Sequence, residues 1–232
     1  MARPALCLLA CLAVGCAETR LAPAVSPEAL RQRAAGLRAT GKTEESVRLY
    51  VQAIAAQRAD TRDGRATSAD LHRELASLRM SADDLAGAEK LYLDALALLE
   101  AAPRGSDAAI INLRTQLAGL CYRQSRLDDA AEFYRTVLAL EVTALGEMHS
   151  DPLGTMSILG GLELKRGRLA EAETLFRRQL RGVQQVHGAE KREITPVLDN
   201  LAEVMEKAGQ PTEAARLRAE AARIRRKLCD EC

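Results

Sequence analysis

The strongest constraint on the fold is a repeat of 42 residues that runs through the chain without a slip in register. Small residues recur at two positions of the repeat, and an aromatic residue follows the second of them by four residues in every unit except the last. A repeat of this length is typical of solenoids, in which each unit buries its apolar face only against its neighbours. The three series are Ala34, Ala76, Ala118, Gly160 and Ala202; Ser46, Ala88, Ala130, Ala172 and Ala214; and Tyr50, Tyr92, Tyr134, Phe176 and Arg218.

Each unit has the pattern of two helices joined by a polar turn. In the third unit, Leu127, Ala130, Tyr134 and Leu138 follow one another at helical spacing, and glycine and proline separate the units. Hydrophobic residues make up 47% of the chain but aromatic residues only 3%, so the apolar mass is largely alanine and leucine, which favours closely packed helices. The sequence therefore predicts an all-α solenoid of five helix-turn-helix repeats over residues 26–228.

The repeat resembles the tetratricopeptide repeat, whose signature is a small residue late in the first helix, another early in the second, and a tyrosine or phenylalanine four residues later. The interval of 42 residues, rather than the usual ~34, resembles the kinesin-light-chain subtype. The joint of that subtype reads Leu-Gly-x-x-His-Pro, and residues 145–152 come close to it, with the proline displaced. The resemblance implies a right-handed solenoid that binds other proteins, without enzymatic activity and without a cofactor.

In this family the first helix of each unit lines a concave groove. Because many of the matching positions here are basic, we expect a protein or peptide partner with acidic residues. The alternative, that these positions are simply solvated helix faces, stays open. The matching positions are Arg31, Arg38, Arg73, Met80, Thr115, Tyr122, Arg123, Ser157, Leu164, Lys165, Asp199, Glu206 and Lys207.

The N-terminus differs from the repeats. Arg3 is followed by an uncharged, largely apolar run that is too short to span a bilayer, where ~20 residues are needed, but has the proportions of a secretory signal. Cys16, just after this run, resembles the lipidation site of bacterial lipoproteins. We expect a signal over residues 1–15, a linker over 16–25 and a membrane anchor on Cys16. The exported protein would then lie in the periplasm or on the outer membrane.

Ordinary signal cleavage after Ala24 is the alternative to lipidation, and it implies export as well. The net charge of the chain is +1, with 33 basic and 32 acidic residues. This balance argues against a nucleic-acid partner, for which a basic excess is expected.

The stretch GLRATGKT, residues 36–43, matches the phosphate-binding loop pattern letter for letter. A working loop of this kind follows a β-strand and opens a helix. The preceding residues favour a helix, and Gly41 aligns with Gly167 and Gly209 at the turn between the two helices of a unit. We therefore interpret the match as accidental and keep nucleotide binding as a third hypothesis.

The chain ends in a Cys-x-x-Cys pair, Cys229 and Cys232, within a predicted tail over residues 229–232. A thiol-active redox protein using this pair is the main alternative function. Redox pairs normally begin a helix, which lowers the thiol pKa, whereas this one follows a helix. A disulfide or a frayed tail accounts for it better. We predict no metal site, because a second pair is missing, and we interpret Cys121 as a small core residue.

Overall fold

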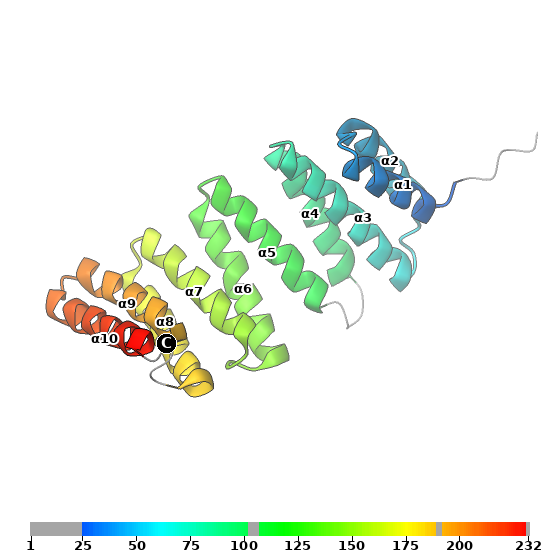
Figure 1. Ribbon diagram of the computed structural model, residues 1–232. Helices are drawn as coiled ribbons and strands as arrows, with labels where there is room; N and C mark the ends of the chain where they lie inside the picture. Colours follow the sequence, from blue (N-terminus) through cyan, green and yellow to red (C-terminus); the bar gives the residue numbers. More distant parts are fainter. Residues whose placement is uncertain (1–24, 102–106, 189–191, 231–232) are drawn as a thin grey trace, which may run out of the picture.

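The structure, a computed structural model, describes residues 25–101, 107–188 and 192–230. Ten α-helices in this part of the chain form five pairs that follow one another along the molecule, from α1 to α10 (Figure 1). A short 3-10 helix, Arg192–Ile194, precedes α9. The predicted all-α solenoid of five repeats is confirmed. The pairs are α1 (Pro27–Ala39) with α2 (Thr43–Ala56), α3 (Arg62–Ser81) with α4 (Leu85–Glu100), α5 (Asp107–Arg123) with α6 (Leu127–Leu145), α7 (Ser150–Lys165) with α8 (Leu169–His187), and α9 (Thr195–Lys207) with α10 (Pro211–Asp230).

The turn within each pair has the same backbone geometry in all five units. One residue of the turn adopts a positive φ, which glycine tolerates and other residues rarely adopt. Three units place glycine there, at Gly41, Gly167 and Gly209, whereas Asp83 (φ 60°) and Ser125 (φ 62°) take the same position in the second and third units. The backbone conformation of the turn therefore repeats every 42 residues, as the sequence does.

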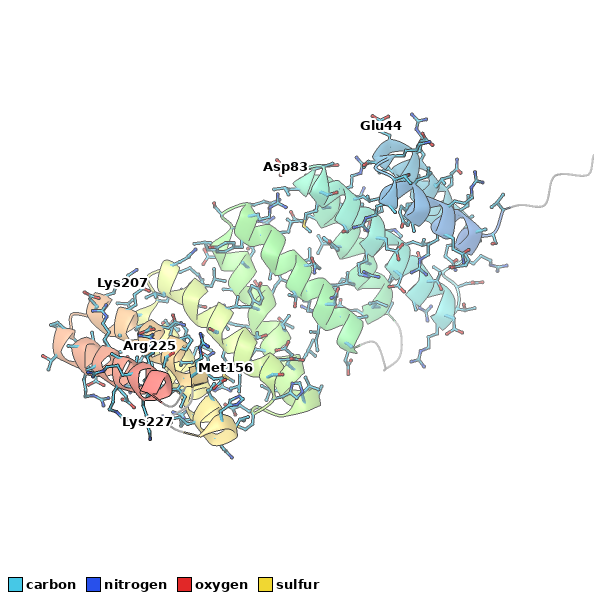
Figure 2. The ribbon with its side chains drawn as sticks, viewed as in Figure 1. Glu44, Asp83, Met156, Lys207, Arg225 and Lys227 are labelled. Atoms are coloured by element: carbon cyan, nitrogen blue, oxygen red, sulfur yellow. The ribbon has the colours of Figure 1, made fainter. Side chains whose placement is uncertain are left out.

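These turns lie along one edge of the solenoid. Figure 2 shows this edge through Glu44, Asp83 and Lys207, each of which lies at or beside a turn within a pair. Side chains cap several of the helices that begin near a turn or joint. The Asp84 carboxylate accepts a hydrogen bond from the Gly87 amide at 3.0 Å, and the Ser26 hydroxyl accepts one from the Ala29 amide at 3.2 Å.

The small residues of the repeat allow the two helices of a pair to pack closely. Ala34, Ala76, Ala118 and Ala202 are fully buried, and so is the second small residue of each of the first four pairs. At Gly160 the approach is closest, because a Cβ atom built there would lie 2.8 Å from two ring carbons of Phe176. This close approach explains why small residues recur at these positions of the repeat.

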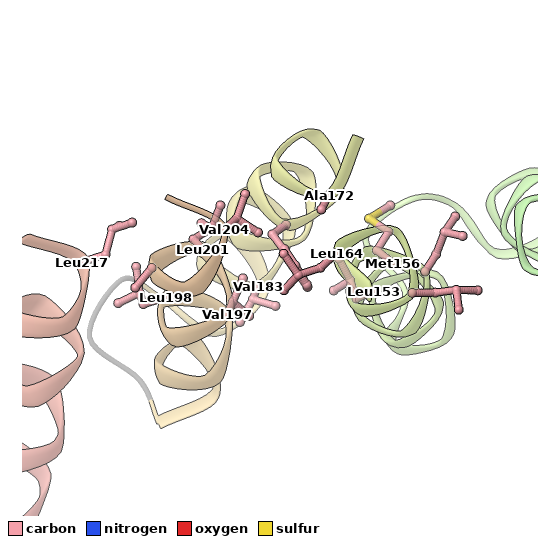
Figure 3. Close-up of a cluster of buried hydrophobic side chains, with 14 of the residues drawn as sticks. Leu153, Met156, Leu164, Ala172, Val183, Val197, Leu198, Leu201, Val204 and Leu217 are labelled. Atoms are coloured by element: carbon pink, nitrogen blue, oxygen red, sulfur yellow. The ribbon is translucent and has the colours of Figure 1, made fainter. Parts of the chain in front are cut away.

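Leucine, alanine and other apolar side chains form three buried clusters along the solenoid. The largest buried cluster runs through the third, fourth and fifth pairs, and Figure 3 shows part of it, with Leu153 and Met156 of α7 and Leu198 and Leu201 of α9. Cys121 is buried in this cluster and burial raises the pKa of its thiol, which agrees with its predicted role as a core residue.

Several predictions concern residues outside the described ranges. The signal (residues 1–15), Cys16, most of the linker and Cys232 lie there. Helix α10 continues to Asp230, so Cys229 belongs to its last turn. None of the described helices is both long and apolar enough to cross a membrane.

The phosphate-loop letters fall in the first pair, as the repeat register predicts. Gly36 lies inside α1, Gly41 lies in the turn, and Thr43 begins α2. The element before the turn is thus a helix, where a phosphate loop requires a β-strand.

Candidate protein-binding surface

The predicted groove residues lie on the first helix of each pair. Most of them are exposed or half-buried. Leu164 is the exception, because it is 8% exposed and belongs to the same buried cluster as Val183 and Leu201 (Figure 3). It contributes to packing, and not to the surface. The others are Arg31 and Arg38 on α1, Arg73 and Met80 on α3, Thr115, Tyr122 and Arg123 on α5, Ser157 and Lys165 on α7, and Asp199, Glu206 and Lys207 on α9.

Three of the four arginines of this surface have acidic neighbours, whereas Arg38 donates a hydrogen bond to the Ser77 hydroxyl. Arg31 pairs with Glu74 of the next unit at 2.6 Å, and Arg123 pairs with Asp83 at 2.9 Å. Arg73 contacts Asp70 on its own helix at 3.3 Å. The positive charge expected from the sequence is therefore largely balanced in the first half of the solenoid.

The pair between Arg31 and Glu74 is the most buried of these contacts. Burial opposes ionisation of Glu74, but hydrogen bonds from Arg31 and Tyr50 outweigh it, so the pKa of Glu74 is lowered. Burial, together with the hydrogen bond to Glu74, raises the pKa of Tyr50 to about 12. This network ties α1 and α2 to α3, and within it the charges of Arg31 and Glu74 compensate each other.

The last unit is balanced in a similar way. Asp199 pairs with Arg225, and Glu206 pairs with Arg218, both across to α10. Lys207 contacts Glu203 at 3.2 Å. The acidic and basic side chains at this end of the surface therefore compensate one another.

An open pocket lies between the third and fourth units. It has a volume of about 350 Å³ and is bounded by α5, α6 and α7. Two of its apolar side chains face solvent, since Tyr122 is 43% exposed and Ile158 is 50% exposed. Large exposed apolar side chains that gather at a hollow mark interaction sites more often than isolated ones do. The lining residues are Gly119, Tyr122, Tyr134, Ser157, Ile158, Gly161, Leu162 and Lys165.

Two glycines open the floor of this pocket. A Cβ atom built at Gly119 or at Gly161 would meet no other atom within 4 Å. The corresponding positions of the other units are Ala35, Ser77 and Glu203. Only the joint between the third and fourth units therefore has glycine on both sides.

Lys165 lies at the rim of the pocket. Its ammonium group is 4.6 Å from the centre of the Tyr122 ring and donates a hydrogen bond to the Tyr122 hydroxyl. The hydrogen bond to this neutral hydroxyl positions the ammonium group at the rim without neutralising its charge. Within the described residues no carboxylate pairs with Lys165, in contrast to Arg31, Arg73 and Arg123.

Comparison with known proteins agrees with the geometry. Residues 153–227 match the sequence model of the family described as tetratricopeptide repeat. One similar solved structure is a putative kinesin light chain from Podosopora anserina, described as having nearly identical TPR-like repeats. It superposes on this chain with a TM-score of 0.68 at 20% identity, and the match covers 87% of this chain and 95% of that one. The fold is a tetratricopeptide-repeat solenoid.

Two further solenoids extend the comparison. BtubC (BKLC) from P. vanneervenii has a TM-score of 0.63 at 20% identity, over 87% of this chain and 80% of that one. YrrB, described as a TPR protein with an unusual peptide-binding site, has a TM-score of 0.57 at 13% identity, over 84% of each chain. Comparison with curated protein sequences gives no match. The predicted likeness to kinesin-light-chain repeats is confirmed at the level of the fold.

The structure brings three predicted groove residues, Tyr122, Ser157 and Lys165, to this one pocket of the solenoid, and adds Ile158, which the sequence analysis missed. The 42-residue alignment could have pointed to Ile158, because it is the one apolar residue at its position in the repeat. The corresponding residues of the other units are polar, namely Gln32, Glu74, Gln116 and Asn200.

A buried ion network lies on the same helix as Lys165 but faces away from the pocket. Glu163 is 1% exposed and pairs with Arg135 and with Arg166, the latter at 2.7 Å. Arg166 also pairs with Asp128 of the preceding unit. These charges are paired with one another and join α6 to α7, so they belong to the scaffold of the solenoid.

Proposed function

We propose that this protein is a non-enzymatic scaffold of the bacterial cell envelope that binds a segment of another protein along the first helices of its repeats. The observation that carries the proposal is the open pocket between α5 and α7, where Tyr122 and Ile158 expose apolar surface to solvent. Proteins that bind partners through grooves commonly combine such apolar hollows with a few polar groups at the rim.

The fold supports a protein partner. Solenoids present extended surfaces built from successive units, and such surfaces suit extended or helical peptide segments. The structure of YrrB is described as having a peptide-binding site, which shows that a solenoid of this type can hold a peptide. A catalytic centre is not part of this proposal.

The location in the envelope rests on the N-terminal residues. Arg3, the apolar run after it and Cys16 are typical of an exported lipoprotein. Expression in a bacterium with labelled palmitate would test this part separately. We expect label on the wild-type chain and none on Cys16→Ala, whereas equal labelling of both chains, or of neither, would contradict the lipid anchor.

Photocrosslinking in cells tests the binding function. A photoreactive amino acid at Ser157, inside the pocket, should give a discrete adduct with one partner. The same amino acid at Lys90, an exposed position on α4, serves as the control. Absence of an adduct from Ser157, or the same adducts from both positions, would count against a scaffold that binds through this surface.

A further inference from the structure

We propose that the pocket between α5 and α7 holds one large apolar side chain of the partner segment, and that a neighbouring aspartate or glutamate of that segment pairs with Lys165. This inference rests on the proposed function and specifies the chemistry of the partner at the same site. It replaces a broadly basic groove with a single apolar anchor and a single charge contact.

The size and lining of the pocket indicate the apolar anchor. A closed cavity of ~150 Å³ lined by aliphatic and aromatic side chains is enough to hold benzene, and this open pocket measures about 350 Å³. Tyr122, Tyr134, Ile158 and Leu162 supply its apolar walls. A leucine, methionine or phenylalanine side chain therefore fits inside, with room for part of the backbone that carries it.

The absence of side chains on the pocket floor indicates close approach of the partner. Nothing within 4 Å would oppose a Cβ atom at Gly161, so the space above this glycine is open to a partner atom. In the last unit the same position is Glu203, and in the first two units it is Ala35 and Ser77. Among the described units, a pocket with glycine on both sides therefore occurs at this joint, which suits one anchor residue per partner segment.

The charges around the pocket indicate the carboxylate. Lys165 lies at its rim and has no acidic partner among the residues that the structure describes. Arg123, which follows the pocket residue Tyr122 on α5, already pairs with Asp83. The buried carboxylate of Glu163 on α7 pairs with Arg135. Among the residues that line this pocket, an opposite charge on the partner is therefore favoured at Lys165.

Synthetic peptides can test this recognition directly. The probes are fluorescent nine-residue peptides of glycine and serine with blocked ends, in which the central residue is leucine, phenylalanine or serine and the next residue is aspartate, asparagine or lysine. Fluorescence anisotropy measures their binding to the full chain in mild detergent, up to roughly 1 mM. We expect the leucine–aspartate and phenylalanine–aspartate peptides to bind at least tenfold more tightly than serine–aspartate or leucine–lysine.

Variants of the protein provide the matched controls. Gly161→Leu fills the pocket from within and should weaken the leucine–aspartate peptide at least tenfold, whereas Gly36→Leu, at a second open helical glycine on α1, should leave binding unchanged. Lys165→Glu should reverse the preference, so that leucine–lysine binds better than leucine–aspartate. Lys90→Glu makes the same charge change on α4 and should have no effect. Circular dichroism confirms that each variant is folded.

Three results would overturn the inference: no peptide binds, binding does not depend on the central apolar residue, or Gly161→Leu binds as well as the wild type. Photocrosslinking separates this failure from failure of the scaffold function. If Ser157 still gives its adduct in the Gly161→Leu background, a partner binds but the apolar anchor is wrong. If the adduct is a second copy of this chain, the inference of a separate acidic partner is wrong.

Discussion

Two adjacent glycines on α7 provide a sharp test of the packing. Gly160 faces Phe176, which is 1% exposed, whereas Gly161 faces the open pocket. Replacing either glycine by alanine gives the same gain in helix propensity, ~1 kcal/mol. Any difference in stability between the two variants therefore reports the contact with Phe176.

The structure indicates the size of this difference. A Cβ atom at Gly160 would lie 2.8 Å from two ring carbons, and ordinary contact begins at 3.4 Å, so the ring must retreat by 0.6 Å. The ring is buried and has little room to do so, and overpacking of this kind typically costs about 1–3 kcal/mol. We expect Gly160→Ala to be less stable than Gly161→Ala by that amount, since the propensity gain cancels in the comparison.

Thermal and urea unfolding, followed by helical circular dichroism, measure the effect. For a chain of this size each kcal/mol shifts the melting temperature by about 2–4 °C. Gly161→Ala should melt above the wild type and Gly160→Ala below Gly161→Ala. Adding Phe176→Leu to Gly160→Ala should reduce the difference because the smaller side chain relieves the contact. Equal melting temperatures for the two alanine variants would refute the proposed packing of Gly160 on Phe176.

Three further perturbations test other contacts. Burial raises the pKa of Glu141, and its Oε2 atom accepts no hydrogen bond from the described residues. The contribution of Glu141 to the unfolding free energy should therefore fall as the pH rises from about 4 through this raised pKa, and urea titrations should show Glu141→Gln gaining stability relative to the wild type across this range. Arg166→Met leaves Glu163 with only Arg135 and should lower stability by up to about 3 kcal/mol, part of which Glu163→Gln should restore in thermal melts. Ser125→Gly relieves a positive φ and should raise stability by about 1 kcal/mol; an unchanged melting temperature would show that the turn carries no strain.

The sequence was sufficient to predict the backbone of the repeats. Small residues at fixed intervals allow close helix packing at only one register, and glycine at Gly41, Gly167 and Gly209 marks the turn that requires a positive φ. In the second and third units Asp83 and Ser125 occupy the same position of the turn, so no glycine marks it in the sequence. Their role follows only from the register of the whole chain.

The electrostatic character of the groove was harder to predict. A count of arginines on the first helices suggested a basic surface, but ion pairs such as Arg31 with Glu74 join residues of different units. Such pairs depend on how adjacent units are rotated and on side-chain conformation, neither of which sequence spacing specifies. Leu164 was misplaced for a similar reason, because its burial depends on the neighbouring unit that covers it.

Departures from the repeat carry the information about recognition. Units with the same backbone present equivalent surfaces, so a partner can select one joint only through residues that differ from their equivalents. Some departures serve the fold: the Ser46 hydroxyl donates a hydrogen bond to the Ala34 carbonyl at 2.8 Å, and Arg218 pairs with Glu206 at the solvated end. Ile158, by contrast, stands where the other units have a polar residue, and half of its surface is exposed to solvent. Ile158 and Gly161 line the same pocket between the third and fourth units, which is why we propose the recognition site there.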